Sequence, residues 1–155
     1  MQQRIVLDTN IWVKAIIDEE YDLFCDDALN SFFQNREYRL ALDYQGEIER
    51  EYRDNIRGNR RFEIRMKQLE RENRKCWADS ALDRKQKMDL IKYGFHEKED
   101  HIFVGTAMHS DKIIVTEDSD YGVHGELQAQ QVSIYMKEQM GLSVLTGRQF
   151  AALHK

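Results

Sequence analysis

Short apolar runs that end abruptly in acidic or polar residues constrain the fold of this chain more than any other feature. Residues 5–7 (Ile-Val-Leu) form such a run, and Asp8 follows at once. Further strand candidates lie at 38–42, 113–115 and 143–145. Short runs rich in Ile, Val and Leu are typical of buried parallel strands. Stretches with helical spacing separate these runs, so the sequence predicts an α/β domain with a mostly parallel sheet.

The stretches between the strand candidates predict helices of uneven character. Apolar residues recur at helical spacing over 21–33, and a very charged helical pattern runs from about 45 towards 76. Further helices are expected over 77–93, from 97 onward, and over 125–140. The chain has 155 residues, no proline and no low-complexity linker. A single domain over 1–155 is therefore predicted.

Composition limits the cellular compartments in which the protein is expected. No run of 18 apolar residues occurs, so a membrane helix is not expected. The N-terminus has no long apolar segment of a secretory signal. Cys25 and Cys76 are too few for a disulfide framework and are expected to be reduced thiols. These observations predict a cytoplasmic protein.

The net charge of -5 is unevenly distributed along the chain. Residues 53–92 contain 13 Lys and Arg but only 7 Asp and Glu, a local charge of +6, and the remainder carries -11. A basic stretch of this kind indicates a polyanionic partner. The acidic remainder is either solvated surface or, in part, a set of metal ligands.

Several acidic residues stand where a parallel sheet binds its ligands. Asp8 follows one strand candidate, and Asp118 and Asp120 follow another. The carboxyl ends of parallel strands meet at one edge, where ligands bind. Asp100, near the start of the helix that precedes the third strand candidate, is placed to join them. Clustered carboxylates repel one another, and a hard cation such as Mg²⁺ or Mn²⁺ relieves that repulsion. The alternative for each acid alone is a helix cap or a loop residue.

The run from Val6 to Val13 resembles the opening strand of the PIN domain, the nuclease fold of many RNA-processing enzymes and toxins. Further matching segments follow in order along about two thirds of the chain: Leu40–Leu42 with Ile48, Glu51 and Tyr52; Asp100–Ala107; Ile114–Tyr121; and Val144–Thr146 with Phe150. The segment at about 53–96 has no clear counterpart and is interpreted as a charged helical insert. The resemblance implies a three-layer sandwich, with helices on both sides of a central, mostly parallel sheet.

The resemblance implies a metal-dependent endoribonuclease that hydrolyses phosphodiester bonds of single-stranded RNA, leaving 5′-phosphate and 3′-hydroxyl ends. Its acidic quartet falls on Asp8, Glu51, Asp100 and Asp118, with Asp120 as an extra acid. Asp8, Asp100 and Asp118 would bind Mg²⁺ or Mn²⁺, and Glu51 would orient the water. A site of this kind activates water and neutralises the phosphate charge. The resemblance gives Asn10 and Thr116 supporting or substrate-contacting roles.

Three glutamates near the start of one predicted helix, Glu47, Glu49 and Glu51, are candidates for the glutamate of the quartet. Glu47 and Glu51 are four residues apart and share one helix face, whereas Glu49 does not. Helical spacing leaves the choice between them open, and the family match favours Glu51. The alternative is a solvated helix glutamate.

The basic segment has two interpretations. Its arginines alternate with glutamates, as in an exposed helix with many salt bridges. A nuclease also needs cations beside the backbone it cuts, and Arg57, Arg60 and Arg61 are the candidates for RNA binding. Trp77 could stack on a base, but its neighbours and its burial tendency favour the core.

Other functions are weaker matches. The five histidines lack the cysteines and spacing of a zinc site. A haloacid-dehalogenase-like phosphatase needs a second acid two residues after the first, where this chain has Asn10. Two alternatives stay open: a PIN-like scaffold that binds RNA or protein without cutting, and the toxin of a toxin–antitoxin pair, whose partner is an antitoxin protein. A homodimer is an assembly suggested by the resemblance, without an indicated interface.

Overall fold

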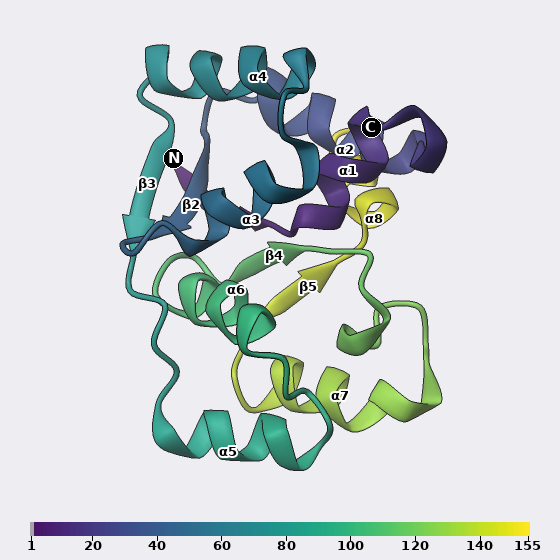
Figure 1. The fold of residues 1–155 in the computed structure, drawn as a ribbon. Coiled ribbons are helices and arrows are strands. Elements are labelled where there is room, and N and C mark those ends of the chain that lie inside the picture. Colours follow the sequence, from purple (N-terminus) through teal and green to yellow (C-terminus); the bar gives the residue numbers. More distant parts are fainter. Residues whose placement is uncertain (1) are drawn as a thin grey trace.

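A computed structural model describes residues 2–155, and a five-stranded parallel sheet lies at its centre (Figure 1). The strands are arranged in the order β3-β2-β1-β4-β5. Their bounds are β1 (Gln3–Leu7), β2 (Tyr38–Asp43), β3 (Lys75–Ala78), β4 (Ile113–Val115) and β5 (Ser143–Leu145). Each neighbouring pair is parallel. The predicted α/β class with a mostly parallel sheet is therefore confirmed.

Helices flank this sheet as a three-layer fold requires. Their bounds are α1 (Thr9–Ile16), α2 (Leu23–Gln34), α3 (Glu47–Ile56), α4 (Arg60–Arg71), α5 (Arg84–Lys92), α6 (Lys98–Met108), α7 (Gln130–Glu138) and α8 (Gly147–Ala152). Short 3-10 turns add η1 (Asp18–Glu20), η2 (Ser119–Tyr121) and η3 (Leu127–Ala129). Figure 1 places α4 at one end of the molecule and α5 with α7 at the other. No helix within residues 2–155 has both the length and the apolar character that a membrane span requires.

The strand order places the end of β1 at a special position in the sheet. From β1 the chain moves to β2 and β3 on one side, and later to β4 and β5 on the other. The direction of winding therefore reverses beside β1, which pairs with β4 through Val6–Ile114 and Leu7–Val115. Crevices at such a reversal, outside the carboxyl ends of the strands, are where open α/β sheets bind ligands.

Side-chain caps define where several helices begin. Asp8 accepts a hydrogen bond from the Thr9 N–H at the start of α1. Asp43 accepts the N–H groups of Glu47 and Ile48 at the start of α3. The Thr146 side chain and Gln149 form a reciprocal capping box on α8. A side chain at or just past the end of each of these strands thus stabilises the first turn of the helix that follows.

An aromatic cluster around Trp12 joins the first four helices. The Trp12 ring lies 5.9 Å from Phe33, 5.6 Å from Tyr52 and 5.2 Å from Phe62, between ring centroids. These rings come from α1, α2, α3 and α4. The Tyr52 hydroxyl also donates to the Leu7 carbonyl at the end of β1. The charged helix α4 is therefore anchored to the core by its apolar face.

The segment after α4 differs from the helical pattern predicted for it. Residues 75–78 form β3, an edge strand that pairs with β2 through Leu40–Lys75 and Leu42–Trp77. A helix follows only at Arg84, capped by Asp83. The expectation that Trp77 lies in the core is wrong, because 51% of its surface is exposed. Its position on the outermost strand leaves no further strand or helix to cover it.

Candidate metal centre

The acidic residues predicted from the sequence come from four separate elements. Asp8 lies between β1 and α1, and Asp118 follows β4 and caps η2. Glu51 belongs to α3, and Asp100 belongs to the first turn of α6. Asp8, Glu51, Asp100 and Asp118 all line one pocket of about 300 Å³ at the carboxyl edge of the sheet. The fold thus brings this predicted set to one place.

Thr116 connects the ends of the two central strands. Its hydroxyl donates to Asp8 Oδ2 over 2.6 Å and accepts the Asp118 N–H over 3.0 Å. Asn10 supports the same turn, because its Oδ1 accepts the Glu117 N–H over 3.1 Å. The resemblance implies supporting or substrate-contacting roles for both residues, and here they hold the turn after β4 against the start of α1.

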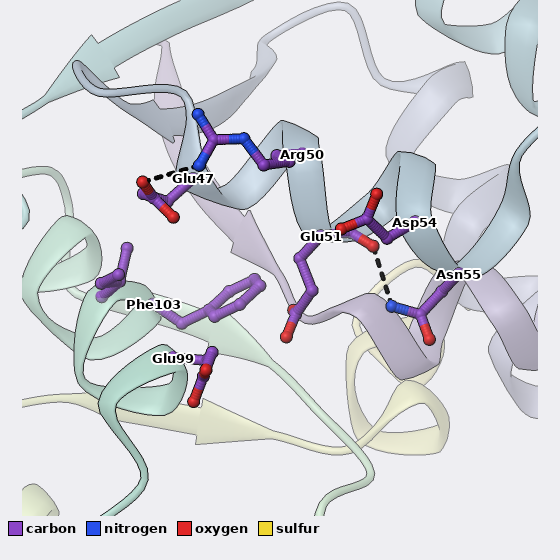
Figure 2. Close-up of a pocket in the computed structure, with 8 residues that line it drawn as sticks. Glu47, Arg50, Glu51, Asp54, Asn55, Glu99 and Phe103 are labelled. Carbon is purple, nitrogen blue, oxygen red and sulfur yellow. Dashed lines mark hydrogen bonds and ion pairs between the residues drawn. The ribbon is translucent and has the colours of Figure 1, made fainter.

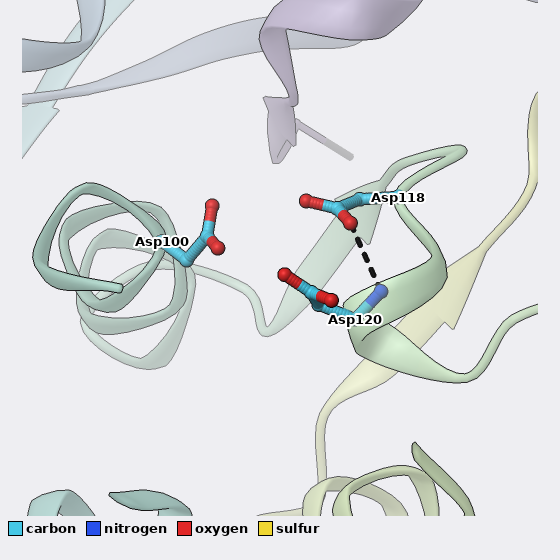
Figure 3. A group of neighbouring side chains, drawn as sticks. All are labelled: Asp100, Asp118 and Asp120. Carbon is cyan, nitrogen blue, oxygen red and sulfur yellow. Dashed lines mark hydrogen bonds between the residues drawn. The ribbon is translucent and has the colours of Figure 1, made fainter. Parts of the chain in front are cut away.

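Asp100, Asp118 and Asp120 form the tightest acidic group in the described residues. One carboxylate oxygen from each lies within 4.8 Å of the others. Figure 3 shows Asp100 approaching from α6, while Asp118 and Asp120 approach from the turn after β4. The Asp120 N–H donates to Asp118 Oδ1 over 2.9 Å, which orients the Asp118 carboxylate. Asp120, predicted as an extra acid, is thus a full member of the group.

Asp8 stands beside this group rather than within it. Its side chain is buried, with 5% of the residue exposed, and each carboxylate oxygen already accepts one hydrogen bond, from Thr9 or Thr116. Its charge nevertheless reaches the group, since it is the largest electrostatic influence on Asp100. A carboxylate oxygen has two lone pairs, so each can still serve a metal.

Glu51 and Glu47 have different surroundings (Figure 2). Glu51 accepts a hydrogen bond from the Thr9 hydroxyl and lines both the acidic pocket and the neighbouring groove between α3 and α6, which Figure 2 shows. Glu47 is exposed and pairs with Arg50 over 2.8 Å. The start of α3, fixed by the Asp43 cap, turns Glu51 towards α1 and leaves Glu47 one turn away. Only Glu51 lines the pocket that holds Asp8, Asp100 and Asp118.

The pKa values of these acids are raised, which reflects burial of clustered negative charge. Burial raises the pKa of Asp8 to about 7, with Asp118 and Glu51 adding to the effect and the hydrogen bonds from Thr116 and Thr9 opposing it. Burial, and then Asp8, Asp118, Asp120 and Glu51, raises the pKa of Asp100 to about 8. Burial also raises the pKa of Glu51 and of Asp118. Perturbation of several acids in one cleft is typical of a functional site.

The residues fit a hard divalent cation. The donors in the group are all carboxylate oxygens, the ligands that Mg²⁺ and Mn²⁺ prefer. Nearby, the Tyr121 hydroxyl is buried without a hydrogen-bond partner within residues 2–155. Asp8, Asp100, Asp118 and Glu51 all add to the effect of burial in raising its pKa, so this hydroxyl lies in the field of the same acids. A buried polar group without a partner is costly, and hydration of a cation at this site is one way to satisfy it.

The three arginines predicted to bind RNA are exposed, Arg57 just after α3 and Arg60 and Arg61 at the start of α4. Arg57 has 82% of its side chain exposed, with Asp54 at 3.6 Å. Arg60 and Arg61 make no hydrogen bond or ion pair to residues 2–155. Arg74 differs, because it is buried and donates to the carbonyls of Phe32, Phe33, Asn35 and Tyr38. The basic segment therefore contains both structural and free cations.

Three residues at this edge have no role predicted from the sequence. Lys14 lines the acidic pocket one helical turn after Asn10. Glu99 lines the neighbouring groove between α3 and α6 and adds to the raised pKa of Glu51. Tyr121 places its hydroxyl in the field of the acids. The spacing of Lys14 from Asn10, which places both on one face of α1, is the signal in the sequence that indicates Lys14.

Comparison with known proteins supports the fold. No family model matches the chain, and no curated protein matches it either. A crystal structure of VapBC2 from Rickettsia felis bound to a DNA fragment from their promoter is similar, with a TM-score of 0.50 and 15% identity. The alignment covers 93% of this chain and 98% of that chain. Together with the parallel sheet, this likeness shows that the chain has a PIN-like fold, as the sequence predicts.

Proposed function

We propose that the protein is a metal-dependent endoribonuclease that hydrolyses phosphodiester bonds of single-stranded RNA. The observation that carries the proposal is the convergence of Asp100, Asp118 and Asp120 within 4.8 Å, beside the buried Asp8, at the carboxyl edge of the sheet. Groups of carboxylates with raised pKa values bind a hard cation and remain ionised when it is present.

In this proposal, Asp8, Asp100 and Asp118 hold Mg²⁺ or Mn²⁺, and Asp120 adds charge at the same position. A bound cation would lower the pKa of water and neutralise charge on the phosphate. Thr116 keeps Asp8 and Asp118 at a fixed separation through its two hydrogen bonds. Asn10 holds the turn that carries Asp118. The chain's contribution is thus a rigid set of oxygens at the end of the sheet.

Glu51 is proposed to orient the attacking water. Its carboxylate accepts a hydrogen bond from the Thr9 hydroxyl and lines the same pocket as Asp8, Asp100 and Asp118. Burial raises its pKa, which increases its ability to accept a proton near neutral pH. Arg57, Arg60 and Arg61 are proposed to attract the RNA backbone, because their side chains are exposed beside the same helix.

The test is cleavage of a fluorescently labelled single-stranded RNA by purified protein. We expect cleavage with Mn²⁺ or Mg²⁺, none with EDTA, and none by Asp8→Asn purified in parallel. The substitution is nearly isosteric but replaces an anionic ligand with a neutral amide, so folding should survive. Equal cleavage by wild type and Asp8→Asn counts against catalysis at this acidic site. Absence of cleavage by the wild type across several RNAs with Mn²⁺ contradicts the proposal and favours the non-catalytic scaffold.

A toxin paired with an antitoxin protein is the second candidate. Tyr21, Leu23 and Phe24, at the start of α2, are exposed apolar residues that a partner chain could cover. The similar VapBC2 chain comes from a structure bound to a DNA fragment from their promoter. Co-expression with the product of the adjacent gene tests this candidate. Formation of a stable complex that suppresses cleavage supports it, and the absence of any complex argues against it.

A further inference from the structure

Trp77 is unusually exposed for a tryptophan. It lies near the end of the edge strand β3, and 51% of its surface is accessible. Tyr44, just past the end of the neighbouring strand β2, is 68% exposed. Tryptophan is highly buried on average, so an indole at this position points to a ligand that stacks on it.

A hollow of about 400 Å³ separates this indole from helix α3. Leu42 and Trp77, paired in register on β2 and β3, contribute to its lining. Arg50 and Arg53 line it from successive turns of α3, and Arg57 lines it from just past the end of that helix. The hollow thus combines one aromatic surface with a row of guanidinium groups.

The acids in the hollow are mostly engaged within the fold. Asp43 is fully buried as the cap of α3. Glu49 is held by Arg53 and Lys75, at 3.1 and 3.0 Å. Arg50 and Arg57, in contrast, contact only exposed acids of their own helix, at 2.8 and 3.6 Å. Exposed pairs of this kind contribute little stability, so both guanidinium groups can turn to a phosphate, which they bind strongly.

Helix α3 links this hollow to the acidic site. Glu51 and Asn55 line both the acidic pocket and the groove between α3 and α6 (Figure 2). Arg50 and Asp54 line both that groove and the hollow beside Trp77. The helix has 10 residues and is about 15 Å long. One extended strand of a few nucleotides can therefore reach from the acids to the indole.

We propose that the hollow beside Trp77 is a nucleotide-binding subsite for single-stranded RNA. One base stacks on the Trp77 indole, and the adjoining phosphates contact Arg50 and Arg57. Proteins that bind single strands combine aromatic stacking surfaces with cationic grooves in this way. The inference rests on the proposed ribonuclease function, because it identifies the path by which RNA leaves the acidic site.

Tryptophan fluorescence tests the subsite, because the chain has two tryptophans and Trp12 is fully buried. The protein is titrated in EDTA, which prevents metal-dependent cleavage, with an eight-nucleotide RNA, the DNA of the same sequence, and inorganic phosphate. We expect saturable quenching by the RNA and none by phosphate. In Trp77→Phe the remaining Trp12 emission should not respond. Quenching by the DNA also supports the subsite, because base and phosphate are common to both strands.

Affinity measured by fluorescence anisotropy of a labelled RNA gives the second readout. Trp77→Ala should weaken binding about 5- to 100-fold, the range for removal of one stacking partner. Phe24→Ala, which removes an exposed aromatic ring on α2, should leave affinity unchanged. Circular dichroism confirms that each variant folds. Unchanged affinity of Trp77→Ala, or wild-type quenching that persists in Trp77→Phe, overturns the subsite.

Cleavage assayed separately distinguishes this inference from the proposed function. RNA cleavage with Mn²⁺, but no quenching and no effect of Trp77→Ala, overturns the subsite and leaves the ribonuclease intact. Quenching that disappears in Trp77→Phe, without cleavage by the wild type, supports the subsite and overturns the ribonuclease.

Discussion

The acidic edge and the basic segment at 53–96 differ in how well the sequence predicts where their charged residues lie in the fold. The acids follow strands, and the ends of parallel strands meet at one edge, so topology alone brings Asp8 and Asp118 together. The arginines lie on helices and a loop, where one turn decides between core and solvent. Arg57 is almost fully exposed, whereas Arg74 is fully buried. The position of a charged residue in the fold is therefore easier to predict when the residue follows a strand than when it lies within a charged helix.

The strongest test of this comparison is Arg74→Met. The guanidinium group satisfies carbonyls of Phe32 and Phe33 in the last turn of α2, which have no partners within that helix. Removing it leaves those carbonyls buried and unpaired. We expect a loss of about 3–5 kcal/mol in the free energy of unfolding, measured by urea denaturation, because each buried carbonyl left without a donor costs about 1–3 kcal/mol. Arg60→Met, an exposed residue on α4, should change it by less than about 0.5 kcal/mol. Similar losses of unfolding free energy in the two variants would show that Arg74 contributes no more to stability than an exposed arginine.

The acidic edge is tested by Asp100→Asn. Loss of one anionic oxygen donor from the group should reduce RNA cleavage about a thousandfold, comparable to loss of other electrostatic groups in active sites. The matched control is Asp111→Asn. Asp111 is an exposed acid that binds Arg4 near the opposite ends of the strands. Initial rates with Mn²⁺ are the measurement, and a wild-type rate for Asp100→Asn would remove this residue from the site.

The raised pKa values predict an unusual dependence of stability on pH in the absence of metal. Asp8 and Asp100 have pKa values of about 7 and 8, above their ordinary value of 3.8. Between about pH 4 and 8 the folded protein binds more protons than the unfolded chain, so stability falls as pH rises through this range. The unfolding temperature in EDTA should fall by more than about 10 °C from pH 5 to pH 8. Asp8→Asn should reduce this slope, and added Mn²⁺ should raise the unfolding temperature most at pH 8. No slope would mean that the acids are well solvated, and a slope of the opposite sign would mean that the fold lowers their pKa values.

The smallest expected effect concerns the free arginines. Reversal of Arg57, Arg60 and Arg61 to Glu should weaken RNA binding while the fold survives, because all three are exposed. The slope of log K against log salt should decrease by about 0.7 for each phosphate that the variant no longer binds. Reversal of Arg84, Lys85 and Lys87 on α5 makes the same change of charge in the same basic segment. Equal effects of the two triple variants would indicate a general attraction rather than a binding face on α3 and α4.

Much of the fold follows from sequence pattern because the strands are short, apolar and sharply ended. The sequence predicts strands at residues 5–7, 113–115 and 143–145 and a helix cap at Thr146, and the structure confirms them. The edge strand β3 escapes prediction because its sequence, Lys-Cys-Trp-Ala, has no apolar alternation and lies between charged helices. The burial expected for Trp77 is wrong because the exposure of this residue depends on the position of β3 at the edge of the sheet, which the sequence does not predict.

The candidate site is predictable in its members but not in its detailed geometry. Strand ends and helix starts indicate Asp8, Asp100, Asp118 and Asp120. The grouping of Asp100 with Asp118 and Asp120, with Asp8 beside it, depends on the η2 turn and on the hydrogen bonds that engage Asp8. The position of Glu51 depends on the Asp43 cap, which sets the rotation of α3. Helical periodicity does not predict a capping residue four positions before the start of a helix. It also does not predict the conformation of a turn after a strand.

A crystal structure of the protein soaked with Mn²⁺, with anomalous diffraction data, tests the central claim most directly. We predict an anomalous peak bound by carboxylate oxygens of Asp100 and Asp118, at the pocket that Asp8 and Glu51 also line. Ligand distances should be close to the values of about 2.0–2.1 Å found for the similar ion Mg²⁺. A folded crystal with no peak at these aspartates, or with Mn²⁺ bound only elsewhere, would contradict the claim that this acidic edge is a metal centre.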